Sequence, residues 1–255
     1  MTEADNLFLT KIWAVHPALL EYKPSPGVSK VGKPLMGDLL SDHKVILAIG
    51  NRLTLIAFSY LPAFSKSLVG AFTSEQEALN ALATRQPTLL LVSEDLEVGY
   101  GISLVSTTKQ KYPDIKCLLF IDRQHPDVIE EAVGAGADSV VRVSSMSSDG
   151  SGDFLKAISA LSKGGVFFPE DVRRTIQDDT SVSERLELLA ELTDREKEVL
   201  ACVAEGRSNA EICSDLQISL PTTKSHISNL TQKLQVSSRT QLAILAIRKK
   251  LVNLV

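Results

Sequence analysis

The residues best suited to specific chemistry lie near the carboxyl end of the chain, where Lys224, Ser225 and Ser228 follow one another at helical spacing. Positions three and four apart lie on the same face of a helix, so Ser228 shares a face with both Ser225 and Lys224. An ammonium group suits the O6 and N7 acceptors of guanine in the major groove, and a serine hydroxyl can donate or accept a hydrogen bond. We therefore predict that these three side chains face the bases of double-stranded DNA.

A second set of polar side chains in the same region suits the phosphate backbone. Phosphate contacts fix the register of a protein on DNA and make its affinity salt-dependent, but they carry no sequence information. Two of these residues have alternative roles. Thr193 could instead cap a helix, and Asn229 could be a surface residue without a DNA contact. The predicted phosphate contacts are Thr193, Asn209, Thr222, Asn229, Lys233 and Arg239.

No pattern of catalytic or metal-binding residues accompanies this set. His16, His43 and His125 stand in separate segments, without metal-ligand spacing and without a nucleophile nearby. Ser93 has no general base to activate it. The three cysteines are an odd number without CxxC spacing, which is typical of reduced thiols in a cytoplasmic protein. We expect neither an enzyme nor a cofactor or metal site.

Short helices with recognisable ends should position the carboxyl-terminal polar residues. Thr193 with Glu196, and Ser208 with Glu211, fit the capping box, in which a hydroxyl and a carboxylate satisfy orphan backbone donors. Gly206 fits the left-handed position that ends a helix. Two short helices joined by a tight turn predict a helix-turn-helix.

A third helix should begin after Ser219, because Pro221 is tolerated in a first turn. The last helix, residues 239–251, has enough apolar side chains to cover the core and to leave some for a dimer contact. Inward positions of the third helix recur at helical spacing at Thr223, Ile227, Leu230 and Leu234.

Charge divides the chain in a way that its net value of −4 conceals. From Gln217 to the end there are six basic residues and no acidic residue, which leaves 21 basic against 31 acidic residues in the rest. A basic module on an acidic body is the pattern expected of a nucleic-acid-binding domain joined to a regulatory domain.

From residue 44 onward, apolar runs alternate with amphipathic segments. Such alternation predicts a parallel sheet wrapped by helices, and the five-stranded flavodoxin-like order is the expected topology of this α/β domain. Ser74 with Glu77 should cap the second helix. The expected strands are residues 45–49, 68–72, 87–92, 116–121 and 139–143, and the expected helices are residues 53–61, 74–85, 102–112, 126–134 and 154–161.

The sequence divides into four stretches, with an all-α helix-turn-helix domain last. Residues 1–43 form an extension, 44–165 the α/β domain, 166–187 a linker and 188–255 the helix-turn-helix domain. In the extension, residues 7–21 fit a short amphipathic helix around Leu9, Ile12, Trp13 and Leu19, interrupted at Pro17. This segment is either a dimerisation or ligand-contact arm or a cover for the next domain. No apolar run is long enough to cross a membrane and no export signal is apparent, so we expect a cytoplasmic protein.

Three strings in the last domain match a known pattern. They are Leu-Thr-x-Arg-Glu-x-Glu-Val-Leu at 192–200, Glu-Gly-x-Ser-Asn-x-Glu-Ile at 205–212 and Thr-x-Lys-x-His-Ile-Ser-Asn-Leu at 222–230. With the Ala-Gly-Ala-Asp turn at 135–138, they make the chain from about residue 44 resemble a response regulator of the NarL/FixJ type, a receiver domain joined to a LuxR-type DNA-binding domain. The resemblance implies that Lys224, Ser225 and Ser228 face the bases.

The receiver chemistry that the resemblance implies is missing from this sequence. The phosphoacceptor aspartate position falls on Ser93, and residues 49–51 are Ile-Gly-Asn where an acidic pair would hold Mg²⁺. The switch hydroxyl position falls on Ile121 and the lysine position on Val143. Phosphoryl transfer needs an acceptor, a held cation and a positive charge over the phosphoryl oxygens. We therefore predict a pseudo-receiver.

Three hypotheses follow. The first is a dimeric DNA-binding transcription regulator whose input is a protein partner, a small ligand or its own dimerisation. The second is a signalling adaptor in which the pseudo-receiver binds a protein and the second domain reads no DNA. The third is a receiver that is phosphorylated at Asp95, two residues beyond Ser93.

Overall fold

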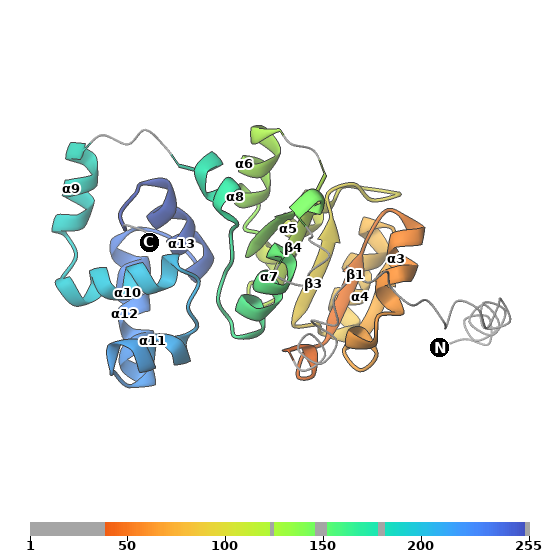
Figure 1. Cartoon of the computed structure of the whole chain (residues 1–255), viewed down its shortest axis with the longest axis horizontal. Coiled ribbons are helices and arrows are strands. Elements are labelled where there is room, and N and C mark those ends of the chain that lie inside the picture. Colours follow the sequence, from red (N-terminus) through yellow and green to blue (C-terminus); the bar gives the residue numbers. More distant parts are fainter. Residues whose placement is uncertain (1–38, 123–124, 146–151, 178–181, 253–255) are drawn as a thin grey trace, which may run out of the picture.

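The computed structural model describes residues 39–122, 125–145, 152–177 and 182–252. Its first part is a five-stranded parallel sheet with the order β2-β1-β3-β4-β5, which confirms the predicted flavodoxin-like topology (Figure 1). The strands are β1 (Val45–Ala48), β2 (Leu68–Phe72), β3 (Leu89–Ser93), β4 (Lys116–Ile121) and β5 (Ser139–Arg142).

Helices cover both faces of the sheet because its central strands are apolar on both sides. The helices are α3 (Arg52–Ser59), α4 (Glu75–Arg85), α5 (Gly101–Lys111), α6 (Pro126–Gly134) and α7 (Asp153–Ser162), with short 3₁₀ turns η2 (Pro62–Phe64) and η3 (Val143–Ser145). Leu55 of α3 and Ile158 of α7 pack on one face, and Leu82, Leu104 and Ile129 of α4, α5 and α6 pack on the other.

One predicted capping contact is wrong. Ser74 occupies the N-cap position of α4, but its side chain makes no capping hydrogen bond. Neither Ser74 nor the predicted partner Glu77 makes that contact. The neighbouring Glu75 holds this end of α4 by accepting hydrogen bonds from the backbone N–H of Tyr100 at 3.0 Å and from the Ser103 hydroxyl at 2.7 Å. These two bonds hold the loop between β3 and α5 against α4.

The first half of the predicted linker is packed structure. Residue 167 forms a β-bridge with Ser139, and helix α8 (Glu170–Thr175) lies against α6. This stretch is packed and not a solvated linker because four of its apolar side chains are fully buried: Val166, Phe168, Val172 and Ile176. Residues 178–181 of the predicted linker lie outside the described residues.

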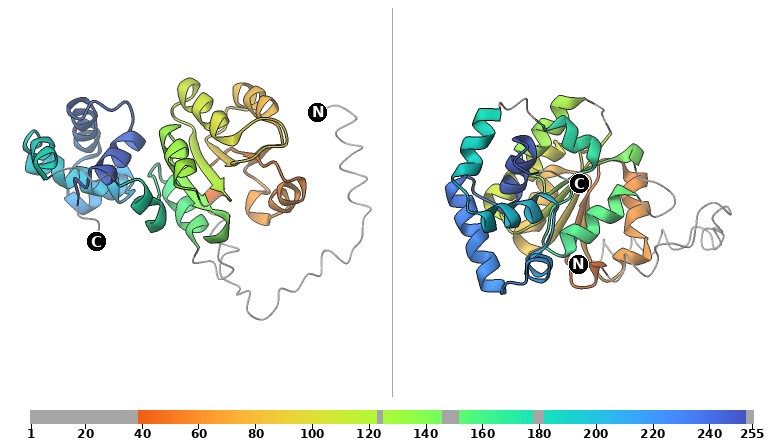
Figure 2. Two further views of the ribbon diagram at one scale, coloured as in Figure 1. Left: turned by 90° about the horizontal axis from the view of Figure 1, so that it is seen from above. Right: turned by 60° about the vertical axis from the view of Figure 1, so that its left-hand side comes forward.

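The carboxyl-terminal part is all-helical, as predicted, with a helix-turn-helix formed by α11 and α12 (Figures 1 and 2). Both predicted capping boxes are present, at Thr193–Glu196 and Ser208–Glu211. Gly206 has the expected positive φ of 85°. The helices are α9 (Val182–Ala190), α10 (Asp194–Ala204), α11 (Asn209–Leu216), α12 (Leu220–Lys233) and α13 (Arg239–Arg248).

The helical part packs directly on the sheet domain, and one cluster of buried apolar residues runs through both. Gly165 and Gly206 bring two backbones together, since a Cβ on Gly165 would lie 2.0 Å from the Gly206 carbonyl oxygen. Lys163 Nζ lies 2.8 Å from Glu211 Oε1, and Arg248 pairs with Glu130. The sequence did not predict this docked arrangement.

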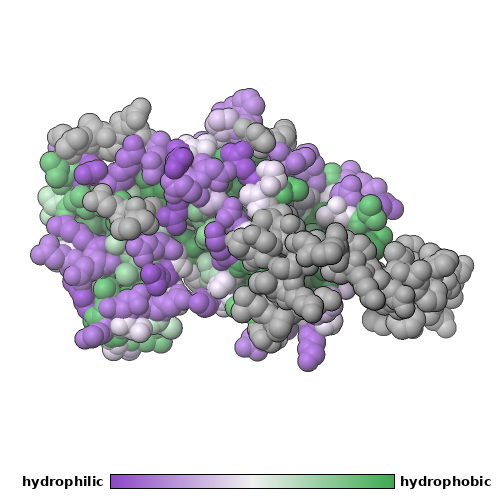
Figure 3. Space-filling model, viewed as in Figure 1, coloured by the Kyte–Doolittle hydropathy of each residue, from purple (hydrophilic) through white to green (hydrophobic). Residues whose placement is uncertain are grey.

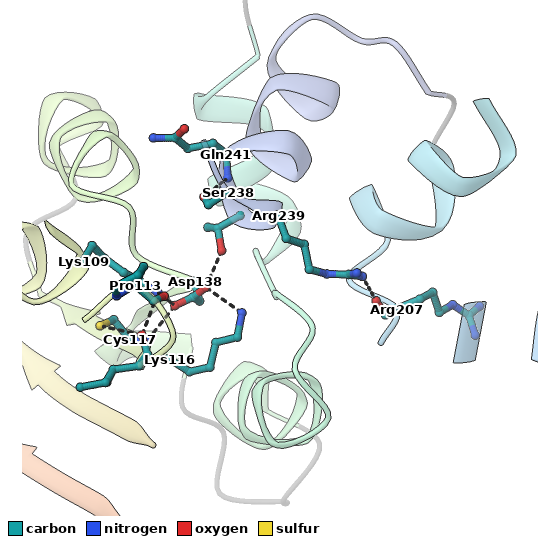
Figure 4. Close-up of polar contacts among 11 residues, drawn as sticks. Lys109, Pro113, Lys116, Cys117, Asp138, Arg207, Ser238, Arg239 and Gln241 are labelled. Carbon is teal, nitrogen blue, oxygen red and sulfur yellow. Dashed lines mark hydrogen bonds and ion pairs between the residues drawn. The ribbon is translucent and has the colours of Figure 1, made fainter. Parts of the chain in front are cut away.

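A buried carboxylate lies at the centre of the contact between the two parts (Figure 4). Asp138, at the turn before β5, is fully buried and lies 2.5 Å from Lys109 Nζ and 3.0 Å from Lys116 Nζ. It also accepts hydrogen bonds from the Cys117 N–H at 2.9 Å and from the hydroxyl of Thr240 in α13. Burial alone would raise the pKa of Asp138, but the two lysines outweigh it and hold the pKa below its ordinary value.

Candidate nucleic-acid interface

Helix α12 presents the side chains that the sequence predicted for base contacts. Its N-cap is Ser219, whose hydroxyl accepts from the Thr222 N–H at 3.2 Å, and Pro221 lies in the first turn. Lys224, Ser225 and Ser228 are all exposed. The predicted inward positions Thr223, Ile227, Leu230 and Leu234 are buried, or half-buried at Ile227.

Arg239 and Asn209, two of the residues predicted to contact phosphates, are hydrogen-bonded to each other. Arg239 donates from Nη1 to the Asn209 Oδ1 at 2.8 Å and from Nη2 to the carbonyl oxygen of Arg207 (Figure 4). Burial lowers the pKa of Arg239 to about 10, and the guanidinium remains positively charged near neutral pH. The pair ties the start of α13 to the start of α11.

Lys233 and Thr193 meet at another carboxylate. Glu196, buried in the first turn of α10, accepts from Lys233 Nζ at 2.8 Å and from the Thr193 N–H at 2.9 Å. Burial would raise the pKa of Glu196, but Lys233 and Thr193 together lower it. Lys233 is exposed although it is held in this ion pair.

The two remaining phosphate candidates, Thr222 and Asn229, are exposed on α12. The Thr222 hydroxyl lies 2.7 Å from that of Ser219. Hydrophilic side chains cover much of the helical part in the view of Figure 3. The structure therefore brings Lys224, Ser225, Ser228, Thr222 and Asn229 onto one helix, with Lys233 at its end.

Most side chains of helix α13 pack against other parts of the same chain. Its apolar side chains are buried, apart from Leu245, which is half-buried. Thr240 and Arg248, near its two ends, contact the sheet domain through Asp138 and Glu130. A dimer contact through this helix stays a prediction.

Ser93, which the sequence predicts at a receiver's phosphoacceptor position, forms internal hydrogen bonds. Ser93, at the end of β3, accepts from the Gly50 N–H at 3.0 Å and donates to the Asp95 carbonyl oxygen at 2.7 Å. We call this pair of bonds the Ser93 bridge. Gly50 fits only because it lacks a side chain, since a Cβ there would lie 2.5 Å from the same Asp95 oxygen. The loops that would surround a metal ion in a receiver are thus in direct contact.

The neighbouring positions have structural roles. Asn51 caps α3, accepting from the Thr54 N–H at 2.9 Å. Ile121 is buried at the end of β4, and Val143 is exposed after β5. Arg142, next to the position predicted to correspond to the receiver's lysine, pairs with Asp171 of α8 at 2.5 Å. Sequence reasoning did not find this partner, which lies in the stretch predicted as linker.

A cavity of about 500 Å³ remains at the carboxyl ends of the strands. Ile49, Phe58, Phe120 and Val143 line its apolar side, and its polar lining includes acidic but no basic side chains. Asp95, also in the lining, is exposed in the loop after β3 and forms a backbone bridge with Tyr100. Among the described residues no group of three or more acidic, histidine or cysteine side chains is placed to hold a metal ion.

The described part of the chain has no helix that is both long and apolar enough to cross a membrane.

Comparison with known proteins agrees with the helix-turn-helix of the carboxyl-terminal part. The luxR family of bacterial regulatory proteins matches residues 190–246. The response regulator protein VraR of Staphylococcus aureus is 31% identical over 196 residues, which cover 76% of this chain and 91% of VraR.

Solved structures of the RcsB response regulator are also similar. One from Salmonella typhimurium has 23% identity and a TM-score of 0.45, covering 79% of this chain and 96% of RcsB. A structure of two RcsB dimers bound to two parallel DNAs has 23% identity and a TM-score of 0.46, covering 80% of this chain and 98% of that one.

Proposed function

The chain belongs to the response regulators with a LuxR-type DNA-binding domain, and from this premise we propose that it is a cytoplasmic, dimeric transcription regulator whose receiver-like domain is not controlled by aspartate phosphorylation. The observation that carries the proposal is the Ser93 bridge. It supports the proposal because Ser93, at the position that we assign to the acceptor, joins the two loops that would surround a metal ion in a receiver.

For DNA, we propose that the exposed face of α12 enters the major groove. Lys224 would contact guanine, while Ser225 and Ser228 would read bases weakly or through water. Thr222, Asn229 and Lys233 would contact phosphates from the same helix, and Thr193, Asn209 and Arg239 from its neighbours. Two copies on a near-palindromic site would follow from two-fold symmetry.

Replacement of Lys224 tests this interface. The best site is first selected from random-sequence DNA, and affinity is then measured over a range of salt concentrations. Lys224→Ala should weaken binding to that site by about 1–3 kcal/mol, roughly 5- to 150-fold, and relax the base preference at one position. Lys111→Ala, which removes the same charge from an exposed position at the end of α5, should leave affinity unchanged.

If Lys224→Ala changes neither affinity nor base preference, the assignment of α12 is wrong. A chain with no salt-dependent DNA binding would support the adaptor hypothesis instead, because phosphate contacts always release counterions. The mass of the complex on the selected site gives the number of copies bound.

Treatment with acetyl phosphate tests the receiver-like domain. We expect no phosphorylated residue in the intact protein by mass spectrometry, because the positions that we assign to the acceptor, to the cation-holding carboxylates and to the lysine carry other residues. Asp95→Asn serves as the control for the remaining candidate. A phosphoryl group on Asp95 that this variant loses would contradict the proposal.

We propose that the input is a protein partner or a small ligand at the pseudo-receiver. The cavity of about 500 Å³ beside the Ser93 bridge supports the ligand form, since its size lies within the range of small-molecule sites. A molecule that binds there raises the melting temperature in proportion to the logarithm of its concentration. Phe58→Ala in the apolar lining should abolish that rise.

A further inference from the structure

Helix α3 exposes an unusual number of large apolar side chains. Leu53, Ile56 and Tyr60 are 78%, 44% and 55% exposed, and Leu61, which follows the helix, is also exposed. Residues 53, 56 and 60 are three and four apart, so they form one stripe along two turns of the helix. We call these three residues with Leu61 the α3 stripe.

The core of the domain does not account for the α3 stripe. The opposite face of α3 already packs on the sheet through Leu55 and Phe58, whose ring lies 5.9 Å from Phe120 and 6.0 Å from Phe154. Single exposed apolar residues are common on protein surfaces. A row of them on one helix marks an interaction site.

The described chain begins close to this helix. Leu40 is fully buried in the same apolar cluster as Leu55 of α3 and Phe64, which follows it. His43 fixes the position, because its ring nitrogens lie 3.0 Å from the Thr88 hydroxyl and 3.2 Å from the Ser162 carbonyl oxygen. These contacts anchor the chain at Leu40 on the face of the sheet that α3 covers.

We propose that residues 7–21 of the extension bind the α3 stripe of the same chain. They carry the apolar residues Leu9, Ile12 and Trp13 at helical spacing, which matches the stripe in both character and length. Residues 22–38 between them and the anchor span up to roughly 55 Å when extended, whereas α3 is about 12 Å long.

A segment of the same chain has an advantage over other occupants of the stripe. A short tether holds it near its target at an effective concentration in the millimolar range. A second copy would need to reach a comparable concentration in solution to compete. The anchor at Leu40 therefore favours binding within one chain.

Trp13 is the only tryptophan in the sequence, which makes the proposal directly measurable in the full-length protein. With selective excitation of tryptophan, its emission in the native protein should be blue-shifted and less quenched by acrylamide than in guanidinium. The double variant Leu53→Gln, Ile56→Gln should move both properties toward the unfolded values. Leu186→Gln, at an equally exposed apolar position on α9, should change neither.

Circular dichroism of each variant confirms that the fold is kept, as expected for exposed positions. An emission at the unfolded wavelength in the native wild type would overturn the proposal. So would a buried Trp13 that the α3 double variant leaves unchanged, because the segment would then bind elsewhere. A blue shift that is lost on dilution would assign the stripe to a second copy instead.

Discussion

Among single residues, Glu211 has two structural roles. It completes the capping box of α11, and it pairs with Lys163 of the sheet domain. The hydrogen bond from Lys163, followed by that from the Ser208 backbone, lowers the pKa of Glu211 to about 2. Because the pKa in the folded state is below its ordinary value of 4.5, the ionised carboxylate stabilises the fold above about pH 4.5, and this contribution is lost as the pH falls toward 2.

We predict that Glu211→Gln will flatten the acid side of the stability profile. Glutamine keeps the capping bond to the Ser208 N–H, so the variant removes the ion pair alone. The loss at neutral pH should be about 0.5–1 kcal/mol, since the pair is partly solvated. Urea unfolding at several pH values measures it, and Glu187→Gln, an exposed position on α9, should reproduce the wild-type profile.

Two glycines between helices also make a specific contact between the two domains. Gly165 and Gly206 allow the segment after α7 to touch the turn after α10, backbone to backbone. Of the two, Gly165 has no positive φ, so a side chain there would act through the contact and not through local strain.

We predict that Gly165→Ala will separate the helical part from the sheet domain while each part stays folded. The added Cβ would overlap the Gly206 carbonyl oxygen, and no flexible side chain is available to yield. A larger radius of gyration in solution scattering and faster proteolysis after residue 176 are the expected results. Gly134→Ala, where a Cβ meets nothing within 4 Å, is the matched control; equal behaviour of the two variants would contradict the prediction.

The elements themselves were largely predictable from sequence. Strands such as Lys116–Ile121 are apolar on both faces. Thr193 and Ser208, which begin two helices, each have a capping partner three residues later in the sequence. Local patterns of this kind need no knowledge of the fold. Helix α8 was missed because Val172 within it and Ile176 just after it are too few apolar residues to show a helical period beside charged neighbours.

For the candidate interface, the sequence predicted which residues are exposed on α12 but not how their neighbours are bonded. Arg239 and Asn209 form a pair across 30 positions, and Thr240 reaches Asp138 across 102. Contacts at such separations leave no periodic signal in one sequence. They depend on how two complete domains dock.

At the scale of the whole molecule, Asp138 couples the two domains. Its carboxylate is held by two lysines and a backbone N–H of its own domain, so only the Thr240 hydroxyl comes from the other side. Removing that hydroxyl leaves the carboxylate satisfied. The coupling can therefore be weakened without unfolding the sheet domain.

We predict that Thr240→Val will weaken docking by about 1.5–3 kcal/mol, the range for a hydrogen bond to a charged group. Valine has nearly the same shape, and Thr240 is buried. Calorimetry should show one unfolding transition in the wild type and two in the variant. Thr84→Val, at an exposed position on α4, should retain one; a single transition in Thr240→Val as well would show that other contacts suffice.

The Ser93 bridge also bears on timing. A phosphorylated carboxylate stores a signal in a covalent bond, and hydrolysis of that bond sets how long the signal lasts. Under our proposal, Ser93, bonded to Gly50 and Asp95, offers no such store. The output then lasts only as long as the bound input does, and the protein reports the present concentration of that input without any memory of an earlier one.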